Sequence, residues 1–169
     1  SFSFTMQNQI DANSSPSVSI RIGGDYPSAW QLMEKLDQMR HPLLIAGFDK
    51  KTIHQSDPST DIINTLFVTL NSNVNLLNNT YITIEGLVGT QTSDNDSFRI
   101  FGPFQHIFGS FGRWQQSLGQ LVIQLQAPID FGLDYVFWFK ILNPKRGIID
   151  APDVYISADI NKTRTVEGH

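Results

Sequence analysis

Aromatic side chains are the first residues whose chemistry suggests binding. Trp114 follows a glycine and an arginine, while Tyr135 and Trp138 lie in the run YVFWFK. Sugar rings stack on exposed aromatic faces, and Trp and Tyr add a polar atom to such a face. The three residues are therefore candidates for carbohydrate binding. The competing interpretation is that the two tryptophans fill a sandwich core or an interface between modules.

The direction of Trp138 follows from strand geometry. Successive side chains of a strand point to opposite faces, so Phe137 and Phe139 share one face and Trp138 takes the other. If the two phenylalanines face a core, Trp138 faces outward or into a contact with another module.

Carboxylates suggest a metal site in one loop. Asp94 and Asp96 flank Asn95 in the stretch TSDNDS. Calcium takes six to eight oxygen ligands from such side chains and from carbonyls, which makes these two residues candidate metal ligands and calcium the candidate cofactor. Asp is also a good turn former, and the complete calcium-loop motif D-x-[DN]-x-[DN]-G is absent, so a turn without calcium is the alternative.

Enzymatic chemistry finds no support in the sequence. The chain has no cysteine, which excludes disulfides, zinc-thiolate sites and cysteine catalysis. The histidines lack zinc spacing, and neither a nucleophile elbow nor a nucleotide-binding loop is present. We therefore expect no enzyme. The histidines are His41, His54, His106 and His169.

Glycosylation motifs point to the secretory pathway. N-x-[ST] sequons occur in stretches that are expected to be loops or tails, so the sequence predicts a glycoprotein at an extracellular or cell-surface location. The candidate acceptors are Asn13, Asn78, Asn95 and Asn161.

Composition narrows the partners. The net charge is -4 and lysines and arginines are not clustered, so nucleic acid is not an expected partner. No run approaches the roughly 20 apolar residues of a membrane span, so we expect none in this segment. A hydrophobic fraction of 40% with only 17% charged residues is typical of a folded domain.

Alternation of apolar and polar residues predicts an all-β fold after residue 42. The apolar faces alternate with polar ones, as in antiparallel sheets that bury one side. About seven short strands at this spacing predict an immunoglobulin-like antiparallel β-sandwich. The expected strands are Leu43–Phe48, Asn64–Leu70, Tyr81–Leu87, Phe98–Phe101, Gln120–Gln126, Asp134–Leu142 and Asp153–Ile160.

One segment has helical spacing instead. In SAWQLMEKLDQM, Ser28–Met39, the residues Ala29, Leu32, Met33 and Leu36 recur at helical intervals. Pro42 would stop the helix. We expect a short amphipathic connector helix that packs against a domain face, because such a helix is marginal alone in water.

The two ends of the chain share a pattern. FSFTMQNQ near the start matches FWFKILNP, and PSVSIRI matches PDVYISA, with the two copies roughly 135 residues apart. That separation is longer than the 20 to 50 residues of solenoid repeats, so it predicts separate tandem modules. Chance similarity between two hairpins is the alternative.

The pattern shared by the two ends suggests that the chain is organised into four parts. Residues 1–22 would be the closing strand pair of a preceding repeat, 23–42 a connector with the helix, 43–160 a complete sandwich repeat, and 161–169 a tail or the next connector. Because a two-strand remnant is unstable alone, the leading strands are expected to pair with a sandwich of the same chain or of a neighbouring copy.

A series of short motifs runs through most of the chain from Ile53 to Ala158. They are IxQSxP (53–58), NTLxVTL (64–70), ITIEGLVGTQT (82–92), Gly112 with Trp114, GQL (119–121), YVFxFxxxNP (135–144) and APxVxISA (151–158). In this order they resemble a repeated module of very large surface proteins of algae and other protists. The resemblance implies a tandem extracellular β-sandwich array in cell-surface, adhesive or mastigoneme-like flagellar filament proteins, without enzymatic activity.

Two functions follow as expectations. The first is a structural or adhesive extracellular repeat module that spaces or assembles a cell-surface or flagellar filament protein, with neighbouring repeats of the same or an identical chain as partners. The alternative is a carbohydrate-binding module, assisted by calcium, with glycans as partners.

Overall fold

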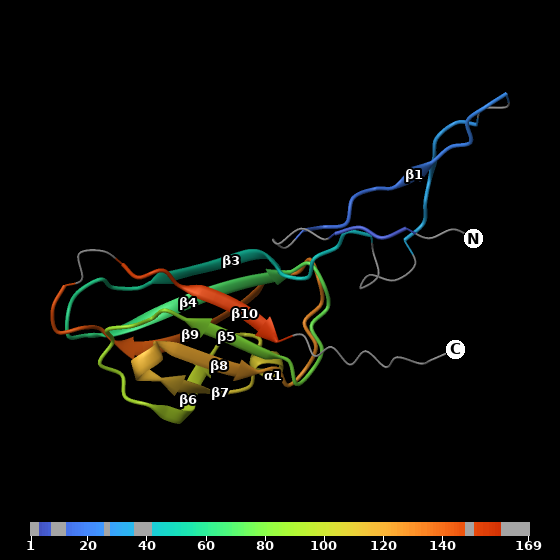
Figure 1. The fold of residues 1–169 in the computed structure, drawn as a ribbon. Helices are drawn as coiled ribbons and strands as arrows, with labels where there is room; N and C mark the ends of the chain where they lie inside the picture. Colours follow the sequence, from blue (N-terminus) through green and yellow to red (C-terminus); the bar gives the residue numbers. More distant parts are fainter. Residues whose placement is uncertain (1–3, 8–12, 26–27, 36–41, 148–150, 160–169) are drawn as a thin grey trace.

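The computed structural model describes residues 4–7, 13–25, 28–35, 42–147 and 151–159 (Figure 1). Within them the chain is almost entirely β. The strands are β1 (Ser19–Ile20), β2 (Gln31–Leu32), β3 (Phe48–Gln55), β4 (Ile63–Ser72), β5 (Tyr81–Glu85), β6 (Asn95–Phe101), β7 (Phe111–Gln115), β8 (Gln120–Gln124), β9 (Tyr135–Leu142) and β10 (Tyr155–Asp159). The helix α1 (Gln105–Phe108) and the 3-10 helix η2 (Gln116–Leu118) are one turn each.

Eight strands form one antiparallel sheet in the order β10-β5-β8-β7-β6-β9-β4-β3. The sheet folds over at β6. This strand pairs with β7 up to Arg99, and its last two residues, Ile100 and Phe101, pair with β9. A strand that changes partner along its length forms the corner between two layers. The expected all-β antiparallel sandwich is confirmed, and the continuous sheet brings it close to a barrel (Figure 1).

The two layers share one core. In β4 the inner residues Leu66, Val68 and Leu70 are buried while their neighbours are half-buried, as the alternation predicted. Near the corner, the ring centroid of Phe98 in β6 lies 5.4 Å from that of Trp114 in the neighbouring strand β7 and 6.0 Å from that of Phe139 in β9. Burial of each large apolar side chain stabilises the fold by about 1.5–3 kcal/mol.

Two close backbone approaches require glycine. Gly119, between η2 and β8, has φ 56°, and a Cβ there would lie 2.3 Å from the carbonyl carbon of Leu87. Gly86 follows β5 with φ 97°, and a Cβ there would lie 2.1 Å from the carbonyl oxygen of Asp153. The backbone before β10 therefore packs directly on the end of β5.

The strand predictions hold for most of the sandwich. Those matching β4, β5, β6, β8, β9 and β10 are confirmed with shifts at their ends, although Ile160 lies outside the described residues. The strand expected at Leu43–Phe48 is wrong, because Leu43 takes a positive φ of 58° and the strand begins only at Phe48. The strand β7 and all of β3 after Phe48 were not predicted.

The prediction of a connector helix at residues 28–39 is wrong for the residues that the structure describes. Residues 28–35 are not helical and contain β2, while residues 36–39 lie outside the described residues. The backbone amide of Met33 donates to the carbonyl of Val18 at 2.8 Å. Pairing with β1 thus replaces the helical bonds that a short amphipathic segment forms only weakly by itself. In the described part of the chain the α-helix is α1, which lies elsewhere, between β6 and β7.

Candidate interaction surface

The described residues 13–25 and 28–35 form an arm that projects from the sandwich (Figure 1). Its two strands pair over only two residues each, Ser19 with Leu32 and Ile20 with Gln31. Two hydrogen bonds close the ribbon at its far end. The Ile22 amide donates to the Ser28 hydroxyl at 2.8 Å, and the Ser28 amide donates to the Ile22 carbonyl at 2.9 Å. A two-stranded ribbon this short has no core of its own and is marginal in water.

The arm exposes apolar side chains. Ile22 is 67% exposed and Leu32 is 71% exposed. Trp30 is 64% exposed and carries the Arg21 guanidinium over its ring at 4.8 Å. Contiguous exposed apolar surface on a soluble protein marks an interaction site more often than scattered single residues do.

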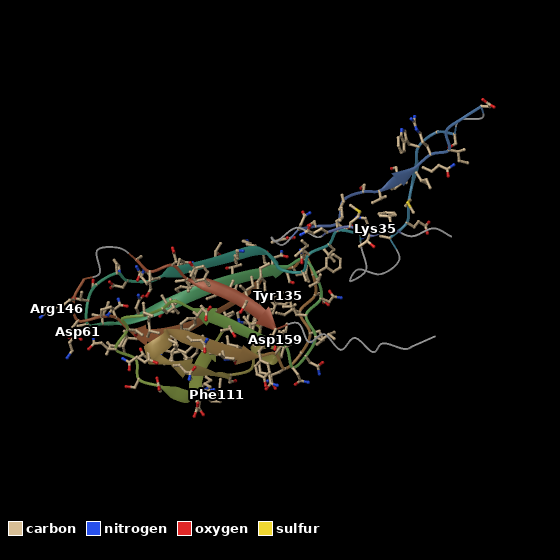
Figure 2. All side chains as sticks on the ribbon, viewed as in Figure 1. Lys35, Asp61, Phe111, Tyr135, Arg146 and Asp159 are labelled. Carbon is tan, nitrogen blue, oxygen red and sulfur yellow. The ribbon has the colours of Figure 1, made fainter. Side chains whose placement is uncertain are left out.

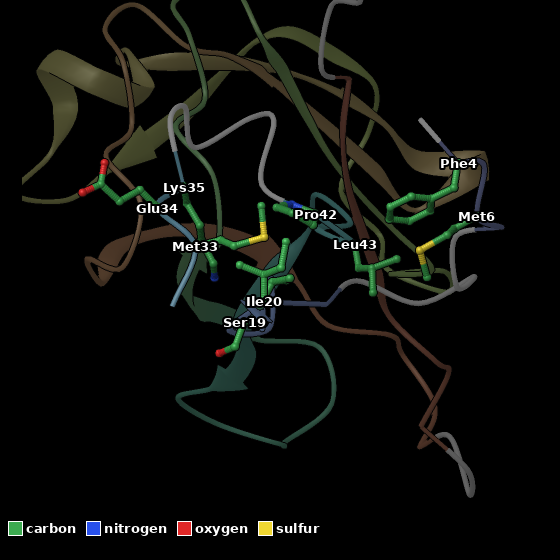
Figure 3. A pocket seen from close by; sticks show the side chains of 10 residues that line it. Phe4, Met6, Ser19, Ile20, Met33, Glu34, Lys35, Pro42 and Leu43 are labelled. Carbon is green, nitrogen blue, oxygen red and sulfur yellow. The ribbon is translucent and has the colours of Figure 1, made fainter. Parts of the chain in front are cut away.

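An apolar cavity of about 630 Å³ lies at the base of the arm (Figure 3). The side chains of Met33, Ile20, Pro42 and Leu43 lie in the centre of the view, while the carboxylate of Glu34 points away from them. The residues that line the cavity are Phe4, Met6, Val18, Ser19, Ile20, Met33, Glu34, Lys35, Pro42 and Leu43. The space is large enough for several apolar side chains of a partner.

Among the described residues, few hydrogen bonds join the arm to the sandwich. Asn13 and Ile45 exchange backbone hydrogen bonds at 3.1 and 3.0 Å. The buried amide of Asn73 donates to the carbonyl of Ile45 at 2.9 Å and so fixes this junction to the sandwich. Near the base, Lys35 donates to the carbonyl of Ser15 at 2.7 Å (Lys35 is labelled in Figure 2).

The leading strand pair expected in residues 1–22 is only partly within the described residues. Residues 4–7 contain no strand, and residues 1–3 and 8–12 lie outside the description. The second expected strand corresponds to β1, which pairs with β2. Among the described residues, the only ladder contact between 4–22 and the sandwich is the Asn13–Ile45 bridge.

The three candidate sugar-binding aromatics do not converge. Trp114 is 1% exposed and its indole N–H donates to the carbonyl of Thr92 at 2.9 Å. Tyr135 is also buried in the sandwich (Figure 2), and its hydroxyl accepts from the Asp130 amide at 3.0 Å. Only Trp138 lies on the outer face, opposite buried Phe137 and Phe139. Trp114 and Tyr135 are therefore corrected to core residues.

Trp138 belongs instead to a row of rings that was not predicted. Across neighbouring strands the register pairs His54 with Phe67, Phe67 with Trp138, and Trp138 with Phe101. The first two pairs have ring centroids 5.0 and 6.0 Å apart. Phe67 stands out of phase with the buried residues of β4, which is the one sequence signal that could have indicated it. We call His54, Phe67, Trp138 and Phe101 the aromatic row.

The two candidate calcium ligands have separate partners. Asp94 accepts a hydrogen bond from the Gln116 amide at 2.7 Å. Asp96 lies 3.3 Å from the Nε of Arg113, and its side chain is 91% exposed. Within the described residues, no group of three or more His, Cys, Asp or Glu could hold a metal ion. The geometry thus gives both carboxylates a role without calcium.

The sequons differ in accessibility. Asn78 and Asn95 are exposed, the latter with its side-chain oxygen bonded to the Ser97 amide at 2.8 Å. Asn13 is half-buried at the junction of arm and sandwich. Asn161 lies outside the described residues.

The sandwich has two open edges beside each other. β3 and β10 end the sheet, and each has a strand partner on one side only among the described residues. A crevice of about 160 Å³ separates them, with Ile53 on the β3 side, Ile156 on the β10 side, and the core residues Val68 and Ile84 also in its lining. Free sheet edges accept further strands unless they are blocked.

Comparison with known proteins found no family model, curated protein or solved structure that is significantly similar to the chain. No helix in the described part of the chain is long and apolar enough to cross a membrane.

Proposed function

We propose that the chain is a structural or adhesive extracellular repeat module that spaces or assembles a cell-surface or flagellar filament protein. Its partners are neighbouring modules of the same or an identical chain. The observation that carries the proposal is the arm, because its residues 16–22 repeat the pattern of residues 152–158, which contain most of β10, while its apolar side chains lack a core to pack in.

The contrast between arm and sandwich supports this function. The sandwich buries its apolar residues in one cluster, whereas the arm exposes Ile22 and Leu32 and has a largely apolar cavity at its base. Burying such surface against another module would stabilise the contact by roughly 25 cal/mol per Å² of apolar area. Modules joined in this way would keep a fixed spacing.

The extracellular location is part of the proposal. The exposed sequons Asn78 and Asn95 are accessible to the glycosylation machinery of the secretory pathway. The absence of cysteine is compatible with that location, since a domain with a core of this size does not need disulfides.

The first test is self-association. Sedimentation of the whole chain should show concentration-dependent association, which Ile22→Ser/Leu32→Ser should abolish. The matched control is Ile63→Ser/Leu77→Ser, which changes two sandwich residues that are 68% and 66% exposed. A chain that stays monomeric at all concentrations, or equal loss in both double variants, would contradict the proposal.

Carbohydrate binding is a second candidate, favoured by the aromatic row on the outer face of the sandwich. Lys140 and Arg99 lie over the Phe101 ring at 5.9 and 5.7 Å and would supply hydrogen-bond donors. Against it, His54 and Phe67 stack on each other with an interplanar angle of 11°, so their faces cover one another.

A glycan array separates the two candidates. A specific sugar signal that is lost in Trp138→Ala but kept in Tyr155→Ala, an exposed aromatic at the other edge, would favour carbohydrate binding. No signal for the unmodified chain would leave the structural module as the function.

A further inference from the structure

The arm contains a near copy of the strand that closes the sandwich. In PSVSIRI (16–22) and PDVYISA (152–158) the prolines align, and so do Val18 with Val154 and Ile20 with Ile156. The next alternate residues are Ile22 and Ala158, both apolar. The two segments therefore have the same face pattern.

That face is the one β10 uses to close the sandwich. Val154, Ile156 and Ala158 are partly buried and pack against the core, whereas Tyr155 is exposed on the other face. Among the described strands β10 pairs with β5 only, over five residues from Tyr155 opposite Glu85 to Asp159 opposite Tyr81. A strand with apolar residues at the three inner positions would satisfy the same site.

Residues 16–22 would form more backbone pairs and bury more apolar surface beside β5 than they do in the arm. In the arm their pairing covers two residues, and Ile20 is 46% exposed. Beside β5, residues 19–22 would take the positions of residues 155–158 and pair over four residues. There Ile22 would bury more apolar surface than the Ala158 it replaces. The crevice between β10 and β3 is lined by Val154 and Ile156, the positions that Val18 and Ile20 would take.

We infer that residues 16–22 of one copy exchange with β10 and pair with β5 of a second copy. Such exchange of equivalent elements is a low-cost route to assembly, because the interactions in the acceptor are already those of the closed fold. The inference rests on the proposed function and specifies its acceptor: the edge of β5, not the free edges of β3 or β10.

Disulfide mapping can test the register, because the chain has no native cysteine. Arg21 aligns with Ser157, which lies opposite Thr83. We mix Arg21→Cys with Thr83→Cys under mild oxidation and identify the linked peptides by mass spectrometry. Thr52→Cys on β3 is the matched acceptor control, and Thr83→Cys/Ser157→Cys in one chain provides the reference for an intrachain link.

Exchange predicts about tenfold more linked product with Thr83→Cys than with Thr52→Cys, because a disulfide needs Cα atoms within about 7 Å. Equal yields with Thr83→Cys and Thr52→Cys would overturn the exchange. So would a mixture of Arg21→Cys with Ser157→Cys that forms the link when the mixture with Thr83→Cys does not. If sedimentation still shows arm-dependent association in that case, the proposed function survives and only the acceptor is wrong. If association is also absent, both fail.

Discussion

Replacing Asn64 by alanine should destabilise the sandwich by removing the centre of a buried polar network. Asn64 is fully buried at the start of β4. Its side-chain oxygen accepts from the amides of Ser56 and Asp57 at 3.2 and 3.1 Å, and from the Ser56 hydroxyl at 3.0 Å. Its amide donates to Gln55 at 2.8 Å and to Asn143 at 3.0 Å.

The size of the stability loss depends on which hydrogen-bond partners of Asn64 can bond to water instead. Asn143 is also buried, so its side-chain oxygen would lose its donor at a cost of about 1–3 kcal/mol. Ser56 and Asp57 lie in a more exposed loop, and their lost bonds should add about 1 kcal/mol together because water replaces part of each bond. The expected loss of unfolding free energy is therefore about 3 kcal/mol.

Chemical denaturation of the variant and the unmodified chain measures this loss. Asn78→Ala is the matched control, because the same change at an exposed turn position should alter stability by less than about 0.5 kcal/mol. In a double-mutant cycle with Asn143→Ala, the two losses should fall short of additivity by about 1 kcal/mol. Equal stability of Asn64→Ala and Asn78→Ala would refute the network's role.

Three further outcomes are expected. Gly119→Ala should lower the unfolding free energy by at least about 2 kcal/mol in thermal denaturation, because the backbone there is in the left-handed conformation and a Cβ would collide with Leu87. Unchanged stability would contradict the close approach. The pKa of Asp134 is held below its ordinary value of 3.8 by hydrogen bonds from Lys50 and then Asn71. Its stabilising contribution is thus full above pH 3.8 and is lost as the pH falls through the lower folded pKa, so the stability difference between the unmodified chain and Asp134→Asn should shrink in acid. After expression in a glycosylating host, mass spectrometry should find a glycan on exposed Asn78, and an empty site there would count against the secretory route.

The sandwich strands were predictable because one face of each is buried. In β8, Leu121 and Ile123 are fully buried and their neighbours are half-buried, so the alternation in the sequence is the alternation in space. β7 escaped prediction because Gly112 interrupts its pattern. A Cβ at that position would lie 2.8 Å from the carbonyl oxygen of Val122 on β8, which is information that only the paired structure contains.

The functional residues were less predictable, since their roles depend on contacts between distant parts of the chain. Trp114 suggested a sugar platform, but whether a tryptophan faces solvent or core depends on what packs around it, here the ring of Phe98 on the neighbouring strand β6. The aromatic row depends on the register of four strands. The helical spacing around Leu32 misled for the same reason, because pairing with β1 outweighed local preference.

The most direct test of arm-mediated assembly is hydrogen exchange of the arm as a function of protein concentration. At low concentration the amides of residues 18–22 are held by the short pairing with β2 and by the bond from Ile22 to Ser28, and they should exchange rapidly. At high concentration their protection should rise markedly, while that of β4 stays constant. Exchange in residues 18–22 that is equally fast at every concentration would contradict the claim that this strand docks on a neighbouring copy.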